Sequence, residues 1–254
     1  MSTSAKVTSI IIPTYNGLPL LQRLIQSIRT YTDEQVTPYE LIVVDNGSSD
    51  GTAEWCASSG ITFVAVTGNI GFPSACNKGL RIASGEQLML LNNDIVVTPN
   101  WLLNLSAGLA QEPSIGLAGP VTNYASGQQQ VTYSFDGIEQ FMRIAEQTNR
   151  SDPNARERVL RIVGLCMLFK REVYEKVGEL DERFSPGHYE DDDYCLRIRM
   201  NGYGLMMCRD ALIYHEGSAS FRQQGEDTVK QLLARNRQLF IDKWGIDPSV
   251  FIGT

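Results

Sequence analysis

The sequence contains no paired cysteine motif, no long apolar run and no excess of basic charge. Its five cysteines include no Cys-x-x-Cys pair, and the N-terminal residues lack the apolar core of a signal peptide. We therefore expect reduced thiols in a cytoplasmic protein with no transmembrane segment and at most a peripheral membrane contact. The 29 acidic residues outnumber the 22 basic ones, giving a net charge of -7. That sign argues against a nucleic-acid partner.

Two nucleotide-binding fingerprints are also missing. The chain lacks the Gly-x-Gly-x-x-Gly motif and the Gly-Lys-Ser/Thr of a P-loop, which argues against a dinucleotide cofactor and a nucleoside triphosphatase. The segment 68–79 instead offers a glycine-containing loop that runs into a predicted helix near Pro73. A helix N-terminus of this kind is suited to phosphate.

Apolar runs alternate with helix-period segments through the first half of the chain. The sequence predicts strands at residues 7–12, 40–45, 62–67 and 87–91, and a first helix over 18–30. This pattern predicts an α/β fold with a Rossmann-like, mostly parallel central sheet flanked by helices.

The second half is less regular. It predicts a strand at 163–170, a helix over 191–201, a strand that ends at His215 and a helix over 227–244. The polar stretches 122–130 and 148–158 are predicted to be mobile loops.

Polar clusters follow several predicted strands, at the sheet edge where open α/β folds bind ligands. They contain Pro13, Thr14, Tyr15 and Asn16; Asp45; Asn69 and Gly71; and Asn92, Asn93 and Asp94. Taken alone, the first cluster is equally typical of a simple strand-to-helix turn. Asp94 is placed either to ligate a divalent cation or to cap a helix.

An acidic cluster, Glu190 to Asp193, and one histidine complete the candidate residues. The acids are typical of a helix N-terminus, where helical spacing lets Asp193 pair with Arg197 and turns Glu190 and Asp191 another way. His215 ends an apolar strand. In isolation it is as readily a structural histidine as a metal ligand.

Together these motifs resemble family 2 glycosyltransferases of the GT-A fold, which are inverting enzymes. The resemblance runs from Ser9–Asn16 through Val43–Thr52, Asn69–Gly71 and Leu90–Asp94 to Gly164, Leu180–Phe184, Glu190–Asp193 and His215. Within the family, the Asn-x-Gly-Phe loop at Asn69 and the terminal His215 resemble rhamnosyl- and galactofuranosyltransferase-like members. The resemblance implies a donor-binding half at 1–120 and a smaller acceptor-binding and catalytic half at 121–254, sharing one core.

The resemblance also implies a role for each candidate residue. A UDP- or dTDP-sugar would bind at Pro13, Thr14, Tyr15, Asn16, Asp45, Asn69, Gly71, Asn77, Asn92 and Asn93, with Asp45 accepting the imide N–H of the base. Asp94 and His215 would hold Mn2+ or Mg2+, although Asn92 replaces the first acid of the usual Asp-x-Asp motif. Asp191 would be the general base, and Gly164 and Glu190 would approach the sugars.

The acceptor stays open between a glycan, a lipid-linked saccharide and a protein, and so does the oligomeric state. The segment 148–158 is a candidate lid for the acceptor site. Trp244 and the aromatic residues near Phe221 are candidates for an acceptor surface or for core packing. Two other functions compete: a non-catalytic GT-A-like binding module, and a sugar-phosphate nucleotidyltransferase, whose basic glycine-rich loop after the first strand is missing here.

Overall fold

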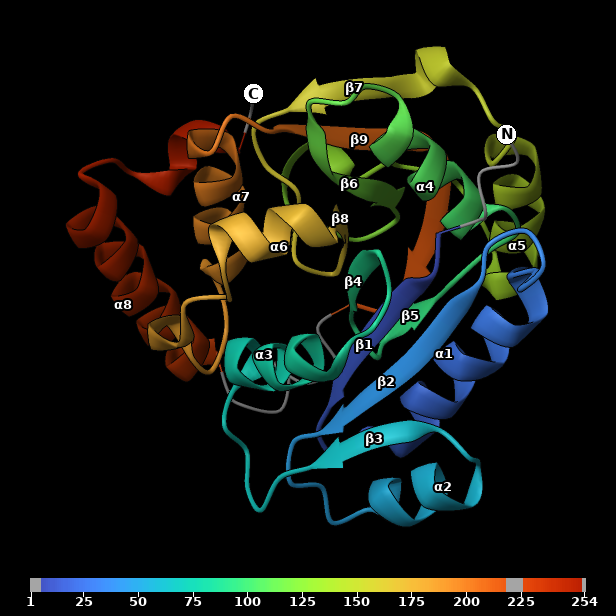
Figure 1. Ribbon diagram of the computed structural model, residues 1–254, viewed down its shortest axis with the longest axis horizontal. Helices are drawn as coiled ribbons and strands as arrows, with labels where there is room; N and C mark the ends of the chain where they lie inside the picture. The colour runs from blue at the N-terminus through green and yellow to red at the C-terminus, as the bar shows by residue number, and fades with distance from the viewer. Residues whose placement is uncertain (1–5, 218–225, 253–254) are drawn as a thin grey trace.

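The computed structural model describes residues 6–217 and 226–252. Within these ranges the chain forms a nine-stranded sheet in the order β3-β2-β1-β4-β8-β6-β9-β5, with β7 paired to β9 (Figure 1). The strands are β1 (Thr8–Thr14), β2 (Tyr39–Asp45), β3 (Thr62–Ala65), β4 (Gln87–Leu91), β5 (Ile95–Val96), β6 (Ile115–Thr122), β7 (Arg156–Val159), β8 (Cys166–Lys170) and β9 (Gly204–His215).

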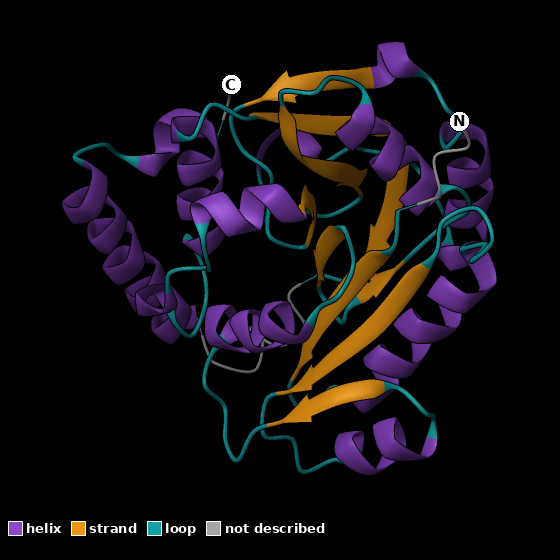
Figure 2. Cartoon of the chain, viewed as in Figure 1, coloured by secondary structure: helices purple, strands orange, loops and turns teal. Residues whose placement is uncertain are grey.

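Helices cover both faces of this sheet (Figure 2). They are α1 (Leu18–Tyr31), α2 (Thr52–Ser58), α3 (Phe72–Ile82), α4 (Trp101–Ala110), α5 (Gly137–Thr148), α6 (Arg171–Val177), α7 (Glu190–Met200) and α8 (Glu226–Trp244). Short 3-10 turns are η1 (Gly127–Gln129), η2 (Pro153–Ala155), η3 (Glu182–Phe184) and η4 (Pro248–Phe251). The expected α/β architecture is therefore confirmed.

The first four expected strands form the parallel part of the sheet. β1 lies between β2 and β4, and β3 pairs with β2, all in parallel. Beyond β4 the sheet is mixed, because β8 runs antiparallel to both β4 and β6, whereas β6 and β9 are parallel. The C-terminal ends of strands β1, β2 and β4 thus lie at one edge of the sheet, where the polar clusters were expected.

Alternating side chains of the central strands feed two cores, one on each face of the sheet. Ile10 and Ile12 of β1 pack with α1, α2 and α4, while Ile11 between them packs with α3, α5, α6 and α7. All three isoleucines are fully buried. Such continuous apolar strands are typical of sheets covered on both faces.

The loop expected at 148–158 is replaced in part by regular structure, whereas 122–130 is a largely irregular segment, as expected; the mobility of both stays a prediction. Residues 148–158 include the turn η2 and most of β7, which pairs antiparallel with the early part of β9. Residues 122–130 contain η1, and Gln129 is buried with its amide donating to the Pro120 carbonyl at 2.7 Å. Hydrogen bonds connect both polar stretches to the rest of the fold, which composition alone does not reveal.

The sheet continues across the expected division of the chain. Residue 120 lies within β6, which pairs with β8 and β9. The division into a donor half and an acceptor half stays a prediction. Among the described residues, no helix combines the length and apolar character needed to cross a bilayer.

Asn149 provides a test of how the segment after α5 is held. Its buried side chain donates to the Thr98 hydroxyl and the Pro99 carbonyl, both at 2.8 Å, and accepts from the Leu212 amide at 2.7 Å. We expect Asn149→Ala to lower the free energy of unfolding by about 2–4 kcal/mol, because it leaves buried groups unpaired. Urea unfolding measures this, with the exposed Asn154→Ala as the matched control. Equal effects of the two substitutions would contradict the assignment.

Candidate active site

A cleft of about 900 Å³ opens at the shared strand edge. That volume suits a ligand of nucleotide-sugar size. Most of the sequence-predicted site residues line it, namely Pro13, Thr14, Tyr15, Asn16, Asn69, Asn92, Asn93, Asp94, Gly164, Glu190, Asp191 and His215. The structure therefore brings together residues from the strand ends and from the first turn of α7.

The turn after β1 is fixed against the turn after β4. The Asn93 amide donates to the Thr14 hydroxyl at 2.8 Å, and a Cβ at Gly17 would lie only 2.6 Å from that amide nitrogen. Glycine is required there by the close approach. Tyr15 remains 42% exposed at the cleft. An exposed ring in this position offers a flat surface for stacking.

Asn46 joins two loops of this edge, and sequence reasoning did not single it out. Its side chain donates to Asn69 Oδ1 at 3.0 Å and accepts from the Ile70 amide at 2.9 Å. Asn46 lines the cleft, whereas Asp45 and Gly71 do not. Asp45 is 3% exposed and accepts from the Ser48 amide at 3.0 Å. The available sequence signal for Asn46 was its position directly after Asp45.

The structure corrects the prediction that Asn77 belongs to the donor-binding site. Its side chain is fully buried, donates to the Leu180 carbonyl at 2.9 Å and accepts from the Leu180 amide at 2.9 Å. It also donates to Glu182 at 3.0 Å. Asn77 therefore ties α3 to the segment before η3 and does not line the cleft.

Strand β5 brings Asp94 and His215 together. Ile95 pairs with His215 in antiparallel register, and the Glu216 amide donates to the Asp94 carbonyl at 3.1 Å. As a result His215 Nε2 lies 3.3 Å from Asp94 Oδ1, with both side chains buried. Residues more than a hundred positions apart in the chain thus form one pair at the cleft.

The surroundings of His215 define which ring nitrogen faces Asp94. Nδ1 lies 2.7 Å from the Tyr124 carbonyl, which can only accept, so Nδ1 carries the hydrogen. Burial lowers the pKa of His215, but Asp94 and the Tyr124 carbonyl outweigh burial, so the net pKa is raised.

This pair fits a divalent cation. A backbone carbonyl that fixes the histidine tautomer is the usual support of a metal-ligating imidazole. One carboxylate oxygen and one imidazole nitrogen suit Mn2+ better than Mg2+, which prefers oxygen ligands. Within residues 6–217 and 226–252, no group of three or more His, Cys, Asp or Glu side chains forms a cation site.

The first turn of α7 holds four buried carboxyl groups. Asp191 Oδ2 accepts from the Gly164 amide at 2.8 Å, and its Oδ1 accepts from the Asp192 amide at 2.9 Å. A Cβ at Gly164 would lie 3.2 Å from Asp191 Cβ, so a larger residue would crowd the aspartate. Asp191 is therefore oriented as a hydrogen-bond acceptor that lines the cleft.

Both neighbours of Asp191 have raised pKa values. Burial, followed by the charge of Asp191, raises the pKa of Glu190 well above its ordinary value. Glu190 Oε2 is buried and has no hydrogen-bond partner among the described residues. Burial and Asp191 also raise the pKa of Asp192, whereas Arg161 opposes the shift. Glu190 is the acid most favoured to hold a proton in this turn.

Asp193 faces away from the cleft. Its Oδ2 accepts from Arg197 at 2.8 Å, as expected, and its Oδ1 accepts from Lys243 at 2.5 Å and from the Trp244 indole at 2.8 Å. Trp244 thus belongs to the interface between α7 and α8. Phe221 lies outside the described residues.

Lining residues that were not predicted include Tyr124, Arg161 and His188. Tyr124 is 45% exposed and its ring lies 5.7 Å from the His215 ring. Each sits in an irregular segment whose path depends on tertiary contacts. No local pattern in the sequence marked them.

Comparison with known proteins gives the family. A model described as glycosyl transferase family 2 matches residues 9–178, more than half of the chain. The chain therefore belongs to glycosyltransferase family 2. The matched region contains Asp94 and Gly164 but ends before Asp191 and His215.

Individual relatives agree with this membership. The chain is 29% identical over 83% of its length to the O-antigen biosynthesis protein RfbC of Myxococcus xanthus. It is 23% identical over 92% of its length to an N-acetylglucosaminyl-diphospho-decaprenol L-rhamnosyltransferase of Mycobacterium tuberculosis, covering 83% of that protein. The chain spans only 17% of RfbC, and 26% of another curated relative.

A solved structure supports the fold. The chain superposes with a TM-score of 0.63 on the mannosyltransferase PcManGT of Pyrobaculum calidifontis, which was solved with GDP-Man and Mn2+. The two are 23% identical, and the match covers 87% of this chain and 61% of the other. The chain thus shares the GT-A architecture of its structural neighbours.

The Asp193 contacts predict a structural effect of its charge. We expect Asp193→Asn to lower the free energy of unfolding by about 3 kcal/mol, because Lys243 and Arg197 lose a buried anionic partner. Thermal or urea unfolding measures the change. Asp242→Asn, on an exposed position of α8, is the matched control and should change stability by less than about 0.5 kcal/mol. A stable Asp193→Asn protein would remove this assignment.

Proposed function

We propose that this chain is an inverting glycosyltransferase that moves a sugar from a UDP- or dTDP-sugar to an acceptor hydroxyl. The observation that carries the proposal is the placement of Asp191 in the same cleft as the Asp94–His215 pair. A base and a candidate cation site in one cleft are what a single displacement at a glycosidic carbon needs.

Asp191 acts in this proposal as the general base. It takes the proton of the acceptor hydroxyl while that oxygen attacks the anomeric carbon, and the bond to the diphosphate breaks on the opposite face. Configuration is inverted without a covalent intermediate. The Gly164 amide orients the carboxylate at 2.8 Å. Glu190, with its raised pKa, is suited to donate a hydrogen bond to a sugar hydroxyl.

The charge of the cleft supports a metal requirement. Four acids, Asp94, Glu190, Asp191 and Asp192, line it, and Arg161 is the only arginine or lysine among its described lining residues. A diphosphate entering such a cleft needs a compensating cation. Asp94 and His215 would hold Mn2+ or Mg2+, which would stabilise the charge of the departing nucleoside diphosphate.

The donor half of the cleft is proposed to bind the nucleotide. Tyr15 offers a stacking surface, and Asn46 and Asn69 rigidify the loops beside it. Asp45 is proposed to recognise the base from beneath this edge. The names of RfbC and of the rhamnosyltransferase favour cell-surface glycan synthesis with a lipid-linked acceptor.

The central test is the transfer reaction itself. We expect Asp191→Asn to lower the transfer rate by about two to four orders of magnitude, the range of a positioned general base. Donor binding should persist, because the amide oxygen still accepts from Gly164. Asp242→Asn is the matched control. Transfer at the parental rate in Asp191→Asn would mean that another group is the base.

A second test concerns nucleotide and metal. Thermal unfolding with UDP, dTDP, GDP or CDP, each with and without Mn2+, should show stabilisation of about 2.7 kcal/mol at a hundredfold excess over Kd for the correct nucleotide. Asp94→Asn and His215→Gln should lose the Mn2+-dependent part of the shift alone. If no nucleotide stabilises the chain, a non-catalytic module is favoured. Release of pyrophosphate instead of nucleoside diphosphate would indicate a nucleotidyltransferase.

A further inference from the structure

We propose that Arg161 is a positioning residue that holds a positive charge beside the Asp191 carboxylate and thereby supports proton transfer to it. This inference rests on the proposed function, since it concerns the efficiency of the same base. Arg161 lies between β7 and β8, thirty residues before α7, in a segment that otherwise carries no catalytic candidate except Gly164.

The contacts of Arg161 concentrate on the acidic turn. Its Nε donates to Asp192 Oδ1 at 2.6 Å, and one terminal nitrogen lies 3.4 Å from Asp192 Oδ2 and 3.9 Å from Asp191 Oδ2. The Arg161 side chain is 11% exposed. The guanidinium therefore spans two adjacent carboxylates in a setting where their mutual repulsion is poorly screened.

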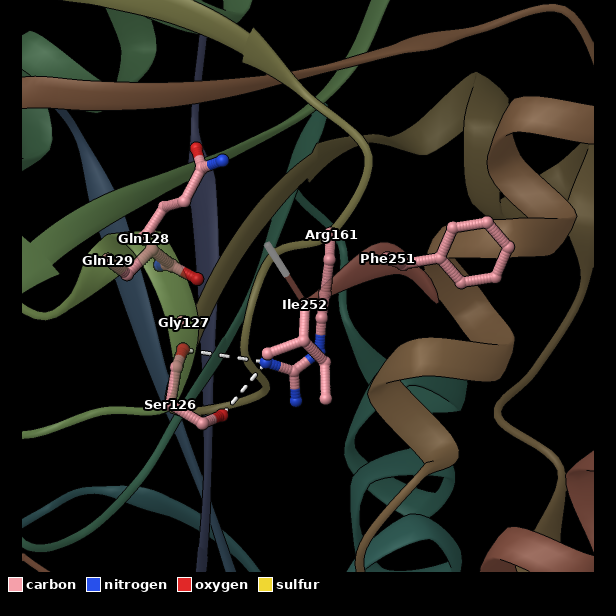
Figure 3. A pocket seen from close by; sticks show the side chains of 7 residues that line it. All are labelled: Ser126, Gly127, Gln128, Gln129, Arg161, Phe251 and Ile252. Carbon is pink, nitrogen blue, oxygen red and sulfur yellow. Dashed lines mark hydrogen bonds between the residues drawn. The ribbon is translucent and has the colours of Figure 1, made fainter. Parts of the chain in front are cut away.

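The rest of the guanidinium is held by the segment directly before η1. The other terminal nitrogen donates to the Ser126 hydroxyl at 2.8 Å and contacts its carbonyl (Figure 3). Ile252 and Phe251, at the end of η4, line the same small pocket as Arg161. A Cβ at Gly127 would lie 2.9 Å from the Ile252 carbonyl oxygen, so this turn packs closely on η1.

These contacts distinguish positioning from substrate binding. Each nitrogen of the guanidinium already faces a protein oxygen, so little capacity remains for a phosphate of the substrate. Its positive charge is also offset by Asp191 and Asp192. Arg161 is therefore placed to act through the base and not on the substrate.

The charge around Asp191 predicts the direction of the effect. Glu190 and Asp192 on α7 disfavour its ionised form, as does the more distant Cys195 thiolate where it forms, whereas His188 favours ionisation only when protonated. Arg161 is permanently charged and favours the carboxylate. Removing this fixed positive charge should therefore move the acid limb of the activity profile to higher pH.

The experiment compares Arg161→Met, Arg161→Lys and Arg161→Met combined with Asp192→Asn. In Arg161→Met we expect kcat to fall about 10- to 100-fold, with donor KM changed less than about threefold, and the acid limb of kcat/KM to move up by about one to two pH units. Arg161→Lys keeps the charge and should leave the limb near its parental position while lowering kcat. The double variant should move the limb back towards the parental pH, because one repelling charge is gone.

Arg156→Met is the matched control. Arg156 also forms a buried pair, with its terminal nitrogen 2.7 Å from Asp210, but it lies on β7 and does not line the cleft. We expect it to lower stability without moving the acid limb. If it does not fold, the exposed Arg158→Met replaces it.

The outcomes separate the two levels of the argument. An acid limb that stays in place in Arg161→Met, while Asp191→Asn abolishes transfer, overturns the role of Arg161 and leaves the proposed function standing. An unaltered limb in the double variant relative to Arg161→Met also overturns it, since a purely structural loss is not repaired by Asp192→Asn. Full transfer in Asp191→Asn overturns the proposed function instead.

Discussion

The burial of four carboxyl groups in one helical turn is the constraint on which the rest of the site depends. Glu190, Asp191, Asp192 and Asp193 are each at most 7% exposed, so water can solvate these carboxyl groups only slightly. The helix N-terminus supplies only part of the compensation. The surrounding chain must therefore place positively charged side chains and hydrogen-bond donors beside this turn.

These partners divide the turn into two sides. Asp193 accepts hydrogen bonds from Lys243, Arg197 and Trp244. These contacts join α8 to α7 and keep the Asp193 side chain out of the cleft. Arg161 and the Gly164 amide serve Asp192 and Asp191 on the cleft side. The same electrostatic need thus packs the C-terminal helix and orients the proposed base. A shift of α8 would disturb both.

The sequence allowed the strand edge of the site to be predicted, because its signals are local. Buried runs such as β1 and β4 end in polar residues, and parallel strands bring those ends to one edge. The pairing of Asp193 with Arg197 was predictable for a similar reason, since helical spacing fixes it. The family resemblance added the roles of Asp191 and His215, which no local rule assigns.

The failures are those of long-range contacts. Asn77 sits in a polar loop-to-helix motif, yet its amide is taken by Leu180, more than a hundred residues later. Within 148–158, Asn149 and Arg156 pair with distant parts of the fold, Arg156 with Asp210, whereas most of the other side chains are exposed. Hydrophobic periodicity carries no information about such polar pairing.

The geometry of Asp94 and His215 also explains how this cleft can tolerate Asn92 where the related motif has an acid. A second carboxylate would add a fifth acidic side chain to a cleft that already contains four and whose described lining offers one arginine. In the proposed site, the imidazole would supply a ligand without adding a negative charge, and the pairing of Ile95 with His215 sets it opposite Asp94. The asparagine and the histidine would then be complementary, because one avoids an additional acid at the strand end and the other provides a ligand from β9.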